Sequence, residues 1–177
     1  RQAIEVSLTA EEYDGDSYSF AIVTDVSNGT TSLSGSTVIY TPNQDWNGTD
    51  TFTFEATDDT GRTMNVATAT ITVNPVNDAP TSGGDINTST NEDTAVDITI
   101  SGTDIDSDNL TYIIEGFNPN HGSGSLNNNI LTFTPAANWN GQTAVGYQVN
   151  DGQLSSDAAT ILVTVNPVND APAVSYT

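Results

Sequence analysis

The sequence lacks several residue types, and each shortage excludes a class of site. Cysteine is absent and His121 is the single histidine, so disulfides, Cys/His zinc sites and cysteine nucleophiles are excluded. His121 lies in an Asn-His-Gly turn, which favours a structural role over that of a catalytic base. No apolar run approaches the ~20 residues that a membrane helix requires, and no signal peptide is visible. The composition therefore favours neither a triad enzyme nor a membrane-inserted protein.

Positive charge is almost absent. Among 177 residues there are two basic side chains, Arg1 and Arg62, against 23 Asp and Glu, and the net charge at pH 7 is −21. Such a chain repels nucleic acid and anionic membranes and gains from bound cations. An acidic surface also favours solubility in salty surroundings. That alternative accounts for the surplus of charge, but not for acids that recur at matched positions.

A repeat organises what is present. The eight residues VNPVNDAP occur at 73–80 and again at 165–172, which places the two copies 92 positions apart (165 minus 73). The triplet WNG recurs in the same order, at 46–48 and 139–141. A repeat of this length predicts an array of whole domains. We predict one domain over 1–77, a second over 78–170, and the start of a following linker or repeat at 171–177.

Apolar and polar residues alternate along both halves, and no helical periodicity competes with this pattern. Short alternating runs separated by Gly, Asn and Asp predict antiparallel β-sandwiches of the Ig type. The fold class is therefore predicted to be all-β, with two sandwiches in tandem. The expected strands are 4–8, 18–22, 38–40, 52–56 and 67–73 in the first half, and 96–100, 110–114, 131–133, 145–149 and 161–165 in the second.

Acidic residues recur in the loops. Asp104 and Asp106 form an Asp-x-Asp motif, and Asp14 and Asp16 form another at the matching position of the first half. Calcium prefers six to eight oxygen ligands, and two carboxylates two residues apart can hold one ion from a loop. The alternative is an acidic turn that is merely solvated. The repetition favours calcium, and bound metal would replace the absent disulfides as a staple.

Together these features resemble the cadherin-like repeats of large bacterial surface adhesins. The most specific motifs are VNPVNDAP, NEDT at 91–94, TPxxxWNG, and NDG at 150–152, and the match covers nearly the whole chain. The resemblance implies cadherin-like sandwiches with Ca²⁺ at the junction between consecutive domains. It also implies an extracellular protein, secreted or anchored at the cell surface, whose partners are the neighbouring repeats of its own chain.

The same resemblance implies the metal ligands. At the central junction they are Asn77, Asp78, Asp104, Asp106 and Asp151, with Asp45 as a weaker assignment. At the next junction they are Glu92, Asn169 and Asp170, and at the free end of the first repeat they are Asp14, Asp16 and Asp58.

Two departures from the family pattern weaken these sites. The counterpart of Glu92 in the first repeat would precede Arg1, so the central junction has one carboxylate fewer. Asn138 stands in the second repeat where the first has Asp45.

The resulting prediction is a non-enzymatic, calcium-stiffened extender of an adhesin. A glycosidase would need two carboxylates in one cleft, whereas these acids are spread over repeated loops. Two alternatives remain open. One is a polysaccharide-binding module, which solvent-exposed Trp46 or Trp139 would favour and buried ones would oppose. The other is calcium-dependent adhesion between copies of the chain.

Overall fold

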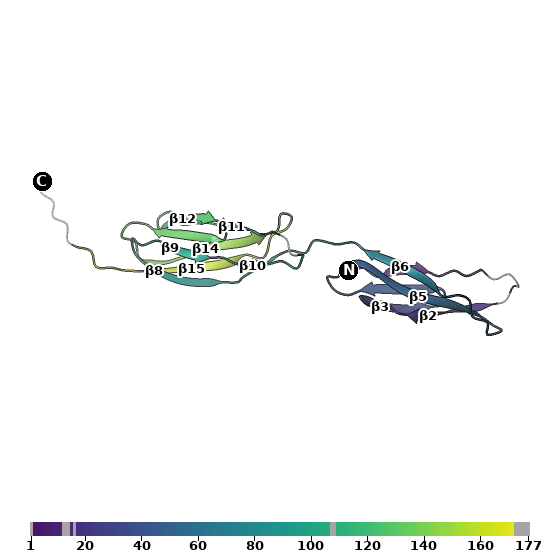
Figure 1. Cartoon of the computed structure of the whole chain (residues 1–177). Coiled ribbons are helices and arrows are strands. Elements are labelled where there is room, and N and C mark those ends of the chain that lie inside the picture. Colours follow the sequence, from purple (N-terminus) through teal and green to yellow (C-terminus); the bar gives the residue numbers. More distant parts are fainter. Residues whose placement is uncertain (1, 12–14, 16, 107–108, 172–177) are drawn as a thin grey trace. The chain divides into compact units, whose positions relative to one another are not determined.

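The computed structural model describes residues 2–11, 15, 17–106 and 109–171, and the regular elements of this part of the chain are all strands. The predicted all-β fold class is thereby confirmed. The chain divides into two compact units, Arg1–Val76 and Asn77–Thr177, and Figure 1 labels most of their strands.

The first unit consists of two three-stranded antiparallel sheets. One has the order β1-β4-β3 and the other β2-β5-β6. Strand β2 carries a bulge between Ile22 and Thr24. The bounds are β1 Ile4–Ser7, β2 Tyr18–Thr24, β3 Gly29–Ser34, β4 Thr37–Pro42, β5 Gly48–Asp58 and β6 Ala67–Val73.

Alternation along the strands builds the core of this unit. Val38 and Tyr40 point inward from β4, Phe52 from β5 and Ile71 from β6, and each is at most 5% exposed. Successive side chains of a strand point to opposite faces, so the intervening residues are left to solvent. The inward faces of the two sheets therefore share one hydrophobic core, as in a β-sandwich.

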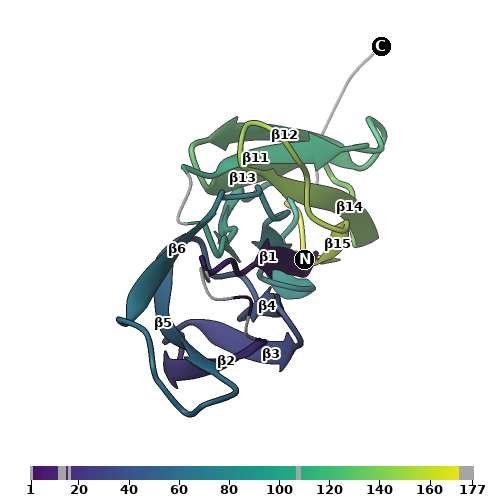
Figure 2. The same ribbon diagram turned by 90° about the vertical axis from the view of Figure 1, so that its right-hand side faces the viewer.

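The second unit is larger. A four-stranded sheet has the order β11-β14-β15-β8, a three-stranded sheet the order β12-β13-β9, and β10 pairs with β7. Seen from one end in Figure 2, β14 and β15 lie side by side, as β5 and β6 do in the first unit. The bounds are β7 Thr81–Ser82, β8 Ile86–Asn91, β9 Val96–Thr99, β10 Gly102–Thr103, β11 Thr111–Glu115, β12 Gly122–Asn127, β13 Ile130–Pro135, β14 Gly141–Asn150 and β15 Ala159–Asn166.

The core of the second unit contains more buried side chains than that of the first. Phe133 on β13, Tyr147 and Val149 on β14, and Ile161 and Val163 on β15 are all nearly or fully inaccessible. The hydroxyl of Tyr147 donates to the carbonyl of Gly84 at 2.7 Å, so the polar end of this buried ring is satisfied.

The strands that the alternation predicts are present in both units. Besides the short pair β7 and β10, three strands were missed: Gly29–Ser34, Ile86–Asn91 and Gly122–Asn127. These three segments consist mainly of Gly, Ser, Thr and Asn, and each is a sheet edge. A strand that buries few side chains carries little apolar alternation, so its place in the sheet comes from backbone pairing.

Candidate calcium-binding residues

Asn77 and Asp151 meet at one end of the second unit. The side-chain amide of Asn77 donates from Nδ2 to Asp151 Oδ2 at 2.8 Å. Asp151 follows β14, and its other oxygen, Oδ1, accepts the backbone N–H groups of Gln153 and Leu154, both at 2.6 Å. The carboxylate therefore organises its own turn and also holds a residue that is 74 positions away.

These donors determine the ionisation of Asp151. The backbone N–H of Leu154 contributes most, followed by the side chain of Asn77 and the backbone of Gln153, and together they hold the pKa of Asp151 below its usual value. Hydrogen bonds donated to a carboxylate stabilise its charged form. Asp151 is therefore an anion at neutral pH.

Asp78, Asp106 and Asp104 are linked in series. The backbone N–H of Asp78 donates to Asp106 Oδ2 at 2.8 Å, and the backbone N–H of Asp106 donates to Asp104 Oδ1 at 2.7 Å. The second oxygen of Asp104, Oδ2, is buried and has no hydrogen-bond partner among the described residues. Buried polar atoms are normally paired, and a buried carboxylate oxygen without a donor is unfavourable.

The Asn77–Asp151 pair and the Asp78–Asp106–Asp104 series are connected, because Asn77 and Asp78 are consecutive residues. Asn77 Nδ2 also lies 3.1 Å from the carbonyl of Asp78. Over the part of the chain that is described, however, no three His, Cys, Asp or Glu side chains are close enough together to hold a metal. The structure thus links these residues through single hydrogen bonds, and their role as ligands remains a prediction. The atoms with which these residues could bind a metal are carboxylate and amide oxygens, the type of ligand that calcium prefers.

Glu92, which directly follows β8, is a buried acid with 6% of its surface exposed. Its Oε1 accepts the backbone N–H of Val168, and its Oε2 lies 3.4 Å from Nδ2 of Asn140. Glu92 therefore contacts the segment that carries Asn169 and Asp170 through Val168. Asn169 itself makes a long contact of 3.5 Å, from Nδ2 to the carbonyl of Asp170.

The remaining predicted ligands serve turns or lie outside the described residues. Asp58 Oδ1 accepts the N–H and the hydroxyl of Thr60 and the N–H of Arg62, which keep its pKa low. Asp45 has a left-handed backbone with φ 55°, and Asn138 has φ 54°. Asp and Asn tolerate this conformation better than most residues, which explains why one repeat has Asp and the other has Asn at this position. The first-repeat Asp-x-Asp motif, Asp14 and Asp16, lies outside the described residues.

Both tryptophans pack in their sandwiches. Trp46 and Trp139 are half-buried and lie against the core of their own unit. Each lies over the glycine of its WNG triplet: a Cβ on Gly48 would be 3.2 Å from Trp46, and one on Gly141 would be 3.3 Å from Trp139. This placement counts against the two rings as exposed sugar platforms.

The single histidine completes this arrangement in the second unit. The ring of His121 stacks on Trp139, with centroids 4.4 Å apart, and its Nδ1 lies 3.2 Å from the hydroxyl of Thr143. The structural role that its turn predicts fits these contacts.

Asp50 is a buried acid that the sequence did not single out. It is 4% exposed on β5 and accepts the backbone N–H groups of Ser27, Asn28 and Thr51 and the hydroxyl of Tyr40. Burial, the largest single influence, raises the pKa of Asp50, but the four hydrogen bonds together outweigh it and the pKa is lowered. With its acceptor sites filled by protein donors, Asp50 has a structural role.

A comparison with the matching residues of the second unit shows which sequence signal could have identified Asp50. At a spacing of 93, Asp50 corresponds to Thr143, and Tyr40 corresponds to Phe133. The acid and its hydroxyl donor are thus replaced together, and Thr143 pairs instead with His121.

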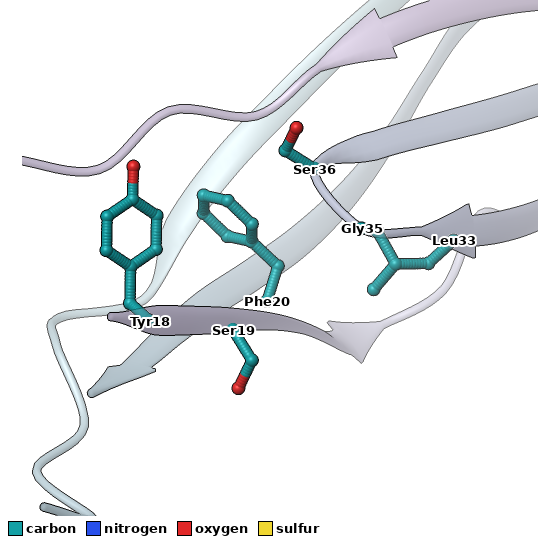
Figure 3. Close-up of a pocket in the computed structure, with 6 residues that line it drawn as sticks. All are labelled: Tyr18, Ser19, Phe20, Leu33, Gly35 and Ser36. Atoms are coloured by element: carbon teal, nitrogen blue, oxygen red, sulfur yellow. The ribbon is translucent and has the colours of Figure 1, made fainter. Parts of the chain in front are cut away.

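Each unit also has an open groove between two edge strands. In the first unit the groove has a volume of about 550 Å³, and Figure 3 shows Tyr18 and Phe20 on one side of β2 with Ser19 pointing away. In the second unit the groove is about 480 Å³. The linings occupy matching positions and contain no charged residue: Tyr18, Ser19, Phe20, Leu33, Gly35 and Ser36, and Leu110, Thr111, Tyr112, Leu126, Asn128 and Asn129.

Comparison with known proteins gives the family and the fold. The family model described as bacterial Ig domain matches residues 1–74 and again 77–164. No curated protein sequence matches the chain. Within the described ranges no helix is long and apolar enough to cross a membrane.

Solved cadherin structures are similar in fold. Human protocadherin-24 EC1-2 is 16% identical with a TM-score of 0.63, and the match covers 94% of this chain and 88% of that one. Human mucin-like protocadherin EC1-2 is 18% identical with a TM-score of 0.57, over 88% and 86%. Mouse cadherin-23 EC22-24 is 23% identical with a TM-score of 0.60, over 85% of this chain, which spans 53% of that structure.

Proposed function

The chain belongs to the bacterial Ig domain family, and from this premise we propose that it is a calcium-stiffened spacer in an extracellular adhesin. Its acidic loops bind calcium at the junction between repeats and hold a more distal binding module away from the cell surface. The partners of each repeat are its neighbours in the same chain. The cadherin-like fold supports the proposal, since such repeats are built for tandem arrays.

One observation carries the calcium assignment. Asp104 Oδ2 is buried without a hydrogen-bond partner among the described residues, while Oδ1 of the same carboxylate accepts from Asp106. A buried carboxylate oxygen without a donor is unfavourable, and the nearby part of the chain offers carboxylates in place of basic side chains. A cation is therefore the partner that the chemistry of the residues fits.

The residues proposed to hold the ion are Asn77, Asp78, Asp104, Asp106 and Asp151. When bound, the ion supplies positive charge that offsets the repulsion between these carboxylates. The chain supplies the positioning: Asp151 fixes its turn through the N–H groups of Gln153 and Leu154, and Asp106 fixes the start of the linker through the N–H of Asp78. Millimolar affinity, with a Kd of roughly 10⁻⁴–10⁻³ M, suits an extracellular module.

We assign the other acids to lesser sites of the same kind. Glu92 contributes to a second site with Asn169 and Asp170, because its buried carboxylate already contacts that segment at Val168. Asp45 contributes an outer ligand at the central junction. By sequence position, Asp58, Asp14 and Asp16 are the counterparts of these ligands in the first repeat.

Calorimetric titration of the chain with calcium tests this proposal. The parent is expected to bind calcium with a Kd in the range given, and Asp104→Asn is expected to lose at least tenfold in affinity. Asp97→Asn is the matched control, because Asp97 is an exposed acid of the same unit that pairs with Thr132. Equal affinity in both variants, or no heat in the parent, contradicts the proposal.

A second candidate function is supported by the paired grooves. The linings of the two grooves combine aromatic rings with hydroxyl and amide groups and contain no charged residue. Because the chain has a net charge of −21, such grooves suit a neutral polysaccharide better than an anionic one. Binding of neutral glycans that Tyr18→Ala abolishes would support this function. Calcium-dependent dimerisation in analytical ultracentrifugation would instead indicate adhesion between copies.

A further inference from the structure

The side chain of Gln153 engages the one side-chain atom of Asn77 that can bind a cation. Gln153 Nε2 donates to Asn77 Oδ1 at 2.9 Å, while Asn77 Nδ2 donates to Asp151 Oδ2 at 2.8 Å. An amide can bind a metal only through its oxygen, because its nitrogen is a donor. Without an ion, one of the two lone pairs of Asn77 Oδ1 is therefore already engaged by Gln153.

The orientation of both amides follows from Asp151. An ionised carboxylate only accepts hydrogen bonds, so the group of Asn77 that faces Asp151 Oδ2 must be its Nδ2. Asn77 Oδ1 then faces Gln153, which must present its own Nε2.

We propose that Gln153 is an intramolecular competitor of calcium, a clasp that holds Asn77 against the 151–154 turn until an ion displaces it. This inference rests on the proposed calcium site. It adds that the second repeat carries its own device for weakening that site. A contact that stabilises only the ion-free form must lower calcium affinity by the same factor.

Among the described residues of the first repeat, the matching position carries no such clasp. The residue that corresponds to Gln153, at a spacing of 93, is Thr60, and its hydroxyl donates to Asp58 within its own turn at 2.7 Å. The shorter side chain satisfies its own turn, whereas Gln153 extends to the linker. The clasp is therefore a property of the central site of this chain, and Thr is the natural replacement for removing it.

The test is a calcium titration of Gln153→Thr beside the parent. Gln153 is exposed, so its hydrogen bond is of ordinary strength, and its loss should tighten calcium binding by about two- to fivefold. Gln142→Thr is the matched control: Gln142 is an exposed glutamine at the opposite end of β14, bonded to Thr164, and this substitution should leave affinity unchanged. Unchanged or weaker binding by Gln153→Thr overturns the clasp; weaker binding would make Gln153 a ligand.

A second readout does not depend on affinity. The side-chain amide signal of Gln153 in a ¹⁵N spectrum, assigned by its disappearance in Gln153→Thr, should move toward the position of a free glutamine when calcium is added. A signal that stays in place in the calcium-loaded parent overturns the clasp and leaves the calcium site intact. If neither parent nor variant binds calcium, the proposed function fails and the clasp with it.

Discussion

Asn77 and Asp151, 74 positions apart, are joined by a 2.8 Å hydrogen bond from Nδ2 to Oδ2. The bond attaches the first residues of the second unit to the turn that follows β14. It holds the linker against the domain without a bound ion. Because a carboxylate is the acceptor, this attachment depends on pH and on the charge of Asp151.

Removing the donor should be visible in the titration of Asp151. In Asn77→Ala the pKa of Asp151 is expected to rise, yet to stay below its ordinary value, because the N–H groups of Leu154 and Gln153 still donate. The stability that Asp151 contributes is present above the unfolded-state pKa of about 3.9 and is lost as pH falls through the lower folded value. The ¹³Cγ chemical shift of Asp151 followed against pH checks the first point. An identical midpoint in parent and variant contradicts it.

Asp50 should matter more to stability than any acid of the candidate site. Asp50→Ala leaves three part-buried backbone N–H groups and the buried hydroxyl of Tyr40 without this acceptor, so we expect the first unit to lose roughly 2–4 kcal/mol. Urea unfolding followed by Trp46 fluorescence in a Trp139→Phe background reports this unit. A loss below about 1 kcal/mol would show that the buried acid is replaceable.

The effect of Asp50 should also vanish in acid. Its pKa is lowered on folding, so the unfolded chain binds more protons between the two pKa values, and the stability contributed by Asp50 falls as pH falls. The difference in unfolding free energy between parent and Asp50→Asn is expected to be constant above about pH 5 and to shrink toward pH 3. A difference that is independent of pH would mean that Asp50 is not an anion in the folded state.

The Trp–Gly pairs should respond to an added methyl group. Gly141 has φ 139°, and a Cβ added there would lie 3.3 Å from the Trp139 ring, so Gly141→Ala combines backbone strain with a close contact. We expect the second unit to lose about 1–3 kcal/mol. Gly116→Ala is the control, since Gly116 has φ 69° but open space around it. Equal losses in the two variants would show that the ring contributes nothing.

Glu92 should protect the end of the second unit from solvent exchange. Its carboxylate accepts the N–H of Val168, which lies beyond the last strand and has no sheet partner. In Glu92→Ala we expect the Val168 amide to exchange with deuterium about tenfold faster, while the amide of Val163 in the middle of β15 is unchanged. Unaltered exchange at Val168 would contradict the contact.

The sequence predicted the strands well wherever the packing of side chains decides where a strand lies. The spacing of two between Val38 and Tyr40, and between Phe52 and Phe54, identified strands because these residues face an apolar core. The same reasoning missed Gly122–Asn127, whose place depends on backbone pairing with β13. Local pattern contains no information about such pairing, and β8 was missed for the same reason.

The site could be predicted only in part. Asp104 and Asp106 are two positions apart in the sequence, so a loop motif identified them. Asp50 and Gln153 carry no motif, and each has a partner that is distant in sequence: Asn28 lies 22 positions from Asp50, and Asn77 lies 76 positions from Gln153. Comparing the two repeats recovers some of this information, because Asp50 and Tyr40 change together to Thr143 and Phe133.

Thermal unfolding in chelator and in millimolar calcium tests the central claim most directly. The parent is expected to melt several degrees higher with calcium, because an ion that binds only the folded state stabilises it by mass action. Asp104→Ala/Asp106→Ala should lose that rise, and Asp97→Asn should keep it. A parent whose melting temperature is the same in chelator and in calcium would contradict the account, since the acidic loops would then be solvated surface alone.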